Sequence, residues 1–203
     1  MLWVGIDVVS SLLYDGYSYV DQTVSELSAI DAPPRPYWLV SGTVYNILAI
    51  AFGAGIWLSW GGRRALRVVA GLFIAYAVLS LLVGPFSSMH QREVLAADGA
   101  TLSDTLHLAL VGIGGITYFA QIAFAVTAFG RRFRLYSLVT ALAMLVFGFV
   151  TSLYAPDVQD NNPTPGVGIY ERISAYGYML WVVVLAATLW RHRAAEGPQA
   201  ERQ

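Results

Sequence analysis

The stretch YWLVSGTVYNILAIAFGAGIWLSW, residues 37–60, decides the fold class of this chain because it contains no charged residue. A helix that crosses the hydrocarbon core of a bilayer needs roughly 20 mostly apolar residues. Residues 37–60 meet that requirement and therefore predict a membrane-spanning helix. Four more stretches of this kind follow, each bounded by Gly, Pro, Arg or Asp, which are common at helix ends. They cover residues 65–86, 105–129, 135–154 and 169–190.

The N-terminal stretch is apolar apart from Asp7, Ser10 and Ser11. It lacks the basic start and the small-residue cleavage site of a signal peptide. We interpret it as a first helix over residues 2–19, either distorted or beginning before the given start. The sequence thus predicts an all-α membrane protein, a bundle of about six transmembrane helices in a single domain over residues 1–190. Residues 191–203 are polar and are predicted to form a disordered cytoplasmic tail.

The overall composition agrees with this class. Of the 203 residues, 57% are hydrophobic and 12% are charged, whereas soluble domains carry about 25% charged residues. The mean hydropathy is +0.57. The absence of cysteine excludes disulfides, thiolate metal sites and cysteine nucleophiles. We expect membrane lipids and other membrane subunits as partners, and no nucleic acid.

The distribution of arginine predicts the orientation. Arginines cluster in two short loops and in the tail, at positions 63, 64 and 67, 131, 132 and 134, and 191, 193 and 202. The positive-inside rule places these clusters in the cytoplasm. Six crossings then put both termini in the cytoplasm and residues 15–36, 87–104 and 155–168 outside. The predicted location is the cell membrane, plasma or inner, as a multi-pass protein.

The outer segments carry most of the groups capable of chemistry, and three of them suggest a metal site. Asp104 and His107 are three residues apart, so they share one face of a helix. His90 precedes them in the same outer segment. Two histidines and a carboxylate could bind Zn²⁺ or another divalent metal and leave a position for water. The alternatives are that Asp104 caps its helix and that His107 donates a hydrogen bond to a carbonyl.

Further charged residues complete the predicted extracytoplasmic pocket. Glu26 and Glu171 are candidate catalytic general bases, and Asp21, Arg92 and Arg172 are candidate substrate-binding residues. Charges at this depth are costly and normally face a bundle interior or a water-filled cavity. The alternative is a structural lid of ion pairs, in which Arg172 pairs with Asp104, Glu26 or Asp160. In this lid Glu171 pairs with Arg92 or a histidine.

Deeper in the predicted bundle, Asn46, Gln121 and Thr140 are isolated polar residues, which predicts hydrogen bonds between helices. Asp7 is the one acid inside an apolar stretch and is a candidate proton-relay group.

Several motifs resemble those of DUF998, a bacterial and archaeal membrane family of unknown function. They are GYSYVDQTVSEL (16–27), GPFSSMHQR (84–92), LSDTLH (102–107), FGRRFRLYS (129–137), PTP (163–165) and GIYERI (168–173). The resemblance implies a six-helix membrane protein of this size and no particular activity.

Three functional hypotheses follow. The first is an extracytoplasmic pocket that binds or hydrolyses a lipid-like or amphiphilic substrate. The second is a non-enzymatic accessory subunit of a larger membrane complex. The third is a small transporter or sensor that depends on Asp7, Asn46 and Gln121.

Overall fold

A computed structural model describes residues 2–60 and 62–200 of the chain. All regular secondary structure in these residues is helical. The elements in chain order are α1 (Leu2–Leu13), η1 (Val24–Ser28), α2 (Arg35–Trp60), α3 (Arg64–Val83), η2 (Gly84–Phe86), α4 (Arg92–Asp98), α5 (Leu102–Ala125), α6 (Arg131–Leu153), α7 (Ala155–Gln159) and α8 (Val167–Ala200). The labels η1 and η2 denote short 3₁₀-helices.

Five helices, α2, α3, α5, α6 and α8, are long and apolar enough to cross a membrane. They correspond to the five predicted spans after the first. Most of them begin two to four residues earlier than the apolar stretches do, because their first turns carry residues such as Arg35 and Arg131. Arginine side chains at a helix end can extend to the interface, so the helix includes them while the apolar stretch does not.

The N-terminal helix differs from its prediction. A helix was expected over residues 2–19, but α1 ends at Leu13. At 1.5 Å per residue a 12-residue helix is about 18 Å long, too short for a hydrocarbon core of about 30 Å. The chain turns away after Leu13 through Gly16, whose φ of +83° suits glycine. The described residues therefore contain five helices of spanning length rather than six.

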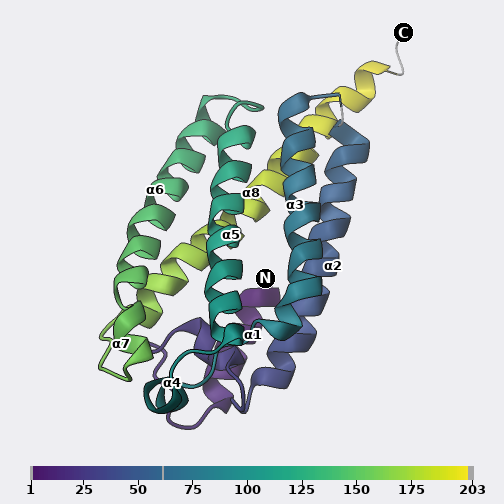
Figure 1. Cartoon of the computed structure of the whole chain (residues 1–203). Helices are drawn as coiled ribbons and strands as arrows, with labels where there is room; N and C mark the ends of the chain where they lie inside the picture. Colours follow the sequence, from purple (N-terminus) through teal and green to yellow (C-terminus); the bar gives the residue numbers. More distant parts are fainter. Residues whose placement is uncertain (1, 61, 201–203) are drawn as a thin grey trace.

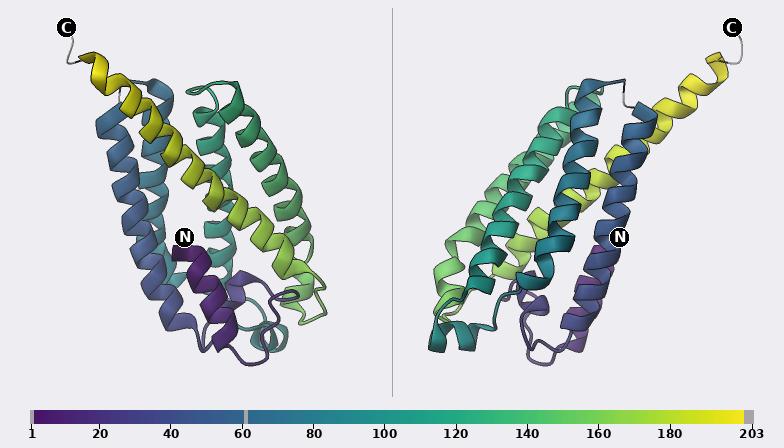
Figure 2. Two further views of the ribbon diagram at one scale, coloured as in Figure 1. Left: turned by 180° about the vertical axis from the view of Figure 1, so that it is seen from behind. Right: turned by 45° about the vertical axis from the view of Figure 1, so that its right-hand side comes forward.

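The helices form one bundle with two distinct ends (Figure 1). The connection between α2 and α3, the connection between α5 and α6, and the C-terminal part of α8 lie at one end. η1, α4 and α7 lie at the other, which we call the loop end. Helix α8 crosses the bundle diagonally, and α1 runs from about mid-height to the loop end beside α2 (Figure 2). The arginines of the three clusters that belong to the described residues thus share the end opposite the loop end.

Two kinds of contact hold the bundle together. Helices α2 and α3 pack closely at Gly53, where an added Cβ would lie 2.8 Å from the Ala70 carbonyl oxygen. Trp181 is fully buried and donates a hydrogen bond to Ser137 on α6 (2.9 Å). Many large apolar side chains remain on the outer surface, such as Leu58, which is 85% exposed. A bundle with this surface is suited to lipid rather than water.

The deeper polar residues behave in two ways. Gln121 accepts a hydrogen bond from Tyr178 and so joins α5 to α8, as predicted. Asn46 and Thr140 instead bond to carbonyl oxygens one turn earlier in their own helices. Interhelical bonding is thus confirmed for one of the three residues, and they do not form a continuous polar path.

The tail also differs from its prediction. Helix α8 continues through Ala200, ten residues beyond the end predicted from the apolar stretch. The segment predicted to be disordered is therefore helical as far as Ala200. Residues 201–203 lie outside the described part of the chain.

Candidate functional site

The predicted site residues all lie at or near the loop end, where the three outer segments meet α5 and the start of α8. They form two buried ion pairs, a histidine–carboxylate contact and a histidine–serine contact, while Asp21 and Glu171 have no cationic partner among the described residues.

The first ion pair joins Glu26 to Arg92. The guanidinium binds both carboxylate oxygens, with Nε–Oε1 at 2.5 Å and Nη2–Oε2 at 2.9 Å. Glu26 is 4% exposed and also accepts bonds from the backbone and side chain of Thr23 and from Gln22. Arg92 donates in addition to the Asn162 and Asp21 carbonyl oxygens. The pair therefore ties η1 to α4 and to the segment before α8, and it leaves Glu26 enclosed by donors.

Asp21 has a similar connecting position on the surface. Its Oδ1 accepts the Gly166 backbone N–H at 2.9 Å, and its carbonyl oxygen accepts the Thr164 hydroxyl at 2.5 Å. Ser18 donates to the other carboxylate oxygen. These bonds link the first outer segment to the turn that precedes α8.

The second ion pair joins Arg172 to Asp7, which was not among its predicted partners. The two distances are 2.9 Å for Nε–Oδ2 and 2.8 Å for Nη2–Oδ1, and the side chain of Asp7 is fully buried. Tyr176 also donates to Asp7. Arg172 further donates to the Tyr19 carbonyl oxygen and lies over the Tyr19 ring, 3.6 Å from its centroid. Asp7 is thus a fixed counter-ion of Arg172 in this arrangement.

Tyr17 completes the surroundings of Arg172. Its hydroxyl accepts a bond from Arg172 Nη2 at 2.9 Å and lies 2.8 Å from the Thr23 carbonyl oxygen. Burial raises the pKa of the Tyr17 phenol far above its usual range, against the opposing effect of the adjacent Arg172. The phenol therefore stays protonated and donates to the carbonyl.

The three residues predicted to bind a metal are divided between two contacts. His90 Nδ1 lies 2.9 Å from Asp104 Oδ2, and the His90 backbone N–H donates to Oδ1 at 2.7 Å. Asp104 also accepts the backbone and side chain of Thr101 and so caps the start of α5. Within residues 2–60 and 62–200, no group of three or more His, Cys, Asp or Glu side chains is arranged to hold a metal ion.

His107 faces two other partners. Its Nδ1 lies 3.1 Å from the Ser87 carbonyl oxygen, and its Nε2 lies 3.1 Å from the Ser25 hydroxyl. The alternative predictions for both residues are confirmed, because Asp104 is a helix cap and His107 is bonded to a loop carbonyl. The contacts of these residues therefore do not favour a metal-dependent reaction.

Glu171 is held differently from Glu26 and Asp7, the carboxylates of the two ion pairs. Its Oε2 accepts the Val24 backbone N–H at 2.6 Å. This is the one hydrogen bond to its carboxylate from the described residues, and none of their cationic side chains forms an ion pair with it. Arg172, its neighbour in sequence, points instead to Asp7.

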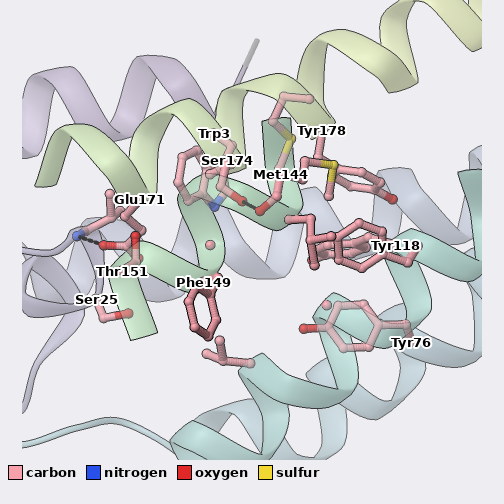
Figure 3. Close-up of a pocket in the computed structure, with 18 of the residues that line it drawn as sticks. Trp3, Ser25, Tyr76, Tyr118, Met144, Phe149, Thr151, Glu171, Ser174 and Tyr178 are labelled. Atoms are coloured by element: carbon pink, nitrogen blue, oxygen red, sulfur yellow. Dashed lines mark hydrogen bonds between the residues drawn. The ribbon is translucent and has the colours of Figure 1, made fainter. Parts of the chain in front are cut away.

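Glu171 lines a cavity of about 610 Å³ between α5, α6 and α8. Figure 3 shows Glu171, Ser25 and Thr151 at one end of this cavity and Tyr76, Tyr118 and Tyr178 at the other. Most of the remaining lining is apolar. A second cavity of about 380 Å³ shares Glu171, Ser25 and Thr151 and also contacts His107 and Asp104. The cavities thus meet at a small polar region beside η1.

The larger cavity has a rim on the outer surface of the bundle. Val111 on α5 and Leu145 and Phe149 on α6 line it, and each is more than half exposed. The space between α5 and α6 therefore faces the surroundings of the bundle, which for a membrane protein are acyl chains.

Two residues at this site were not predicted as site residues. Asp7 was predicted instead as a candidate proton-relay group, because it is the one acid inside an apolar stretch. Ser25 gave no signal, because only the fold brings it to His107, 82 positions later in the chain.

The model of the DUF998 family, described as a protein of unknown function, matches residues 1–188. The chain therefore belongs to this family, as its motifs predicted. Neither the search of curated proteins nor the search of solved structures found a match.

Proposed function

We propose that this DUF998 protein binds a single-chain amphiphile in the cavity between α5, α6 and α8, with the polar head at Glu171 and the chain toward Tyr118. The observation that carries the proposal is a carboxylate without a cationic partner at one end of a largely apolar, laterally open cavity.

The shape and lining of the cavity support an apolar occupant. Its volume of about 610 Å³ falls within the range of about 300–1,000 Å³ typical of small-molecule sites. Val111, Leu145 and Phe149 form an apolar rim on the surface that faces lipid. An acyl chain could therefore enter from the bilayer without crossing water.

The polar end supports a head group that donates hydrogen bonds. The carboxyl oxygens of Glu171 can accept several hydrogen bonds, and among the described residues only the Val24 N–H donates to them. Glu171 is partly buried, and acceptor capacity left unused away from water is costly. A hydroxyl or amine on the amphiphile would supply the missing donors. Glu171 therefore serves as a head-group acceptor, while Glu26, Arg92, Arg172 and Asp21 hold the surrounding segments in place.

The orientation determines the side of the membrane. The positive-inside rule places the arginine-rich end in the cytoplasm, so the loop end and Glu171 lie toward the extracytoplasmic leaflet. The amphiphile is accordingly drawn from that leaflet.

The test is photolabelling of the full chain in lipid nanodiscs. The probe is an ether-linked monoalkylglycerol with a diazirine in its chain, which offers hydroxyl donors and cannot be hydrolysed as an ester. We expect wild-type protein to be labelled on α5 or α6 near Val111 and Phe149. Gly115→Leu should abolish this labelling, because Gly115 lines the cavity and a side chain there would occupy it.

A matched variant controls for the added side chain. Gly112→Leu introduces the same group on the same helix, at an exposed position outside the cavity lining, and should be labelled like wild type. Glu171→Gln should weaken labelling about tenfold or more, since hydrogen bonds to a charged group contribute about 1.5–3 kcal/mol. Equal labelling of wild type and Gly115→Leu would refute the proposal.

A further inference from the structure

Ser25 and His107 have the geometry of a nucleophile and its general base. The Ser25 hydroxyl oxygen lies 3.1 Å from His107 Nε2, and His107 Nδ1 lies 3.1 Å from the Ser87 carbonyl oxygen. An activated serine needs a base within hydrogen-bond distance and a third group that orients the base. The Ser87 carbonyl has the position of that third group.

The Ser87 carbonyl also decides the tautomer of His107. A carbonyl oxygen can only accept, so His107 Nδ1 carries the proton and donates it. Nε2 of the neutral ring is then an acceptor, and the Ser25 hydroxyl donates to it. This is the proton arrangement that a serine nucleophile requires before it attacks.

Ser25 differs in this respect from the other aliphatic hydroxyls that line the two cavities. Ser28, Thr151, Ser152 and Ser174 each donate to a backbone carbonyl oxygen, and Thr23 donates to Glu26. A hydroxyl bonded to a carbonyl has no group that can take its proton. Of these hydroxyls, Ser25 alone is bonded to an imidazole.

Ser25 also lies where the proposed ligand would place its reactive bond. It lines both cavities and lies with Glu171 at the same end of the larger one (Figure 3). An amphiphile with its head group at Glu171 and its chain toward Tyr118 would bring the junction of head and chain past the Ser25 hydroxyl. In a monoacylglycerol that junction is an ester.

We propose that Ser25 is the nucleophile and His107 the general base in hydrolysis of an ester-linked single-chain amphiphile, such as a monoacylglycerol. This inference rests on the proposed function, because the cavity positions the ester. It requires no metal ligand and gives His107 a role different from the one predicted from sequence.

The reaction proceeds in two steps. Ser25 Oγ attacks the ester carbonyl carbon as its proton passes to His107 Nε2. The carbon–oxygen bond to the head group then breaks, and the departing alkoxide takes that proton and leaves as an alcohol. In the second step water attacks the acyl-serine, gives a proton to His107 and releases the fatty acid. The proton on His107 returns to Ser25 Oγ, which restores the starting state.

The test uses the purified full chain and an alkyl fluorophosphonate, which modifies an activated serine covalently. We expect one adduct per chain, mapped by mass spectrometry to Ser25. Ser25→Ala should abolish the adduct. His107→Gln should slow its formation about 100-fold or more, the usual contribution of a general base. Ser59→Ala removes an exposed hydroxyl outside both cavities, at the opposite end of the bundle, and should react at the wild-type rate. Hydrolysis of monooleoylglycerol should follow the same order.

The outcomes separate this inference from the proposed function. An adduct on a different residue, no adduct on wild type, or a wild-type rate for His107→Gln would overturn the inference. The ether-linked photoprobe binds without reacting, so it reports on the cavity independently. We expect the photoprobe to label Ser25→Ala and His107→Gln as strongly as wild type, which would show that both variants are folded. Photolabelling without an adduct would support the proposed binding of an amphiphile and overturn the proposed hydrolysis. An adduct without photolabelling would refute the proposal that the cavity binds the amphiphile.

Discussion

Single residues at the loop end illustrate how a membrane protein accommodates buried charge. Arg172 is 3% exposed, and its guanidinium is satisfied by Asp7, Tyr17 and two backbone carbonyls. Glu26 and Arg92 form a similarly enclosed pair. An isolated charge at these positions would be very costly, so each charge depends on its partner.

Removing both members of the buried pair should therefore cost less than the two single losses added together. We expect Asp7→Asn and Arg172→Gln each to lower the free energy of unfolding by about 3–5 kcal/mol, because each leaves its former partner unpaired. The double variant should lose less than the sum of the two single losses. Denaturant titration in mixed micelles, followed by circular dichroism, measures all three differences.

The exposed Arg132 provides the matched control, since Arg132→Gln removes the same charge at the opposite end of the bundle and should change stability little. If the double variant lost as much free energy of unfolding as the two single variants together, Asp7 and Arg172 would not be energetically coupled, and the ion pair would be contradicted.

Sequence reasoning identified which polar residues gather at this end, but not their pairing. Hydropathy and charge predicted that Arg92 and Arg172 lie at the same end of the bundle, and the structure has both at the loop end, paired with Glu26 and Asp7. Pairing depends on the loop path between residues 14 and 34, which turns at Gly16 and is fixed by contacts with α8. Residues as far apart as Asp7 and Arg172 carry no spacing that could reveal the contact.

At the level of elements, the start of α8 is in direct contact with the first loop segment and helps to hold the loop end together. The Gly168 backbone N–H donates to the Val20 carbonyl oxygen at 2.9 Å, and an added Cβ at Gly168 would overlap the Gln22 and Tyr19 carbonyl oxygens. The first outer segment can approach α8 this closely only because residue 168 has no side chain.

Gly168→Ala should consequently push this segment away from α8. We expect a loss of at least about 1–3 kcal/mol, the usual cost of overpacking, together with weaker protection of the segment from hydrogen exchange. Gly112→Ala, with no neighbour within 4 Å, should leave both measurements unchanged. Similar stability and exchange for the two variants would show that the close approach is absent in the membrane.

The spanning helices were predictable because hydrocarbon thickness imposes a length on any apolar stretch that crosses it. The short helices α4 and α7 were not, since seven and five residues at the surface give no such signal. The first helix was overestimated because its apolar stretch is too short to span a membrane alone and was extended to residue 19, although the helix ends at Leu13.

For the whole molecule, the end with the arginine clusters and the loop end should lie on opposite sides of the membrane. The chain has no cysteine, so single introduced cysteines report without background. We expect an impermeant maleimide to label Asp98→Cys in intact cells and Arg132→Cys only after permeabilisation. Both positions are exposed, so burial does not bias the comparison. Labelling of Arg132→Cys in intact cells would reverse the orientation and the leaflet assigned to the ligand.

The most direct test of the account is an experimental density map of the full chain in nanodiscs containing the ether-linked monoalkylglycerol. The predicted result is elongated density between α5 and α6, with its head within hydrogen-bond distance of Glu171 and beside Ser25. A map in which α5 and α6 close against each other, so that no ligand-sized space remains at Glu171, would contradict the account.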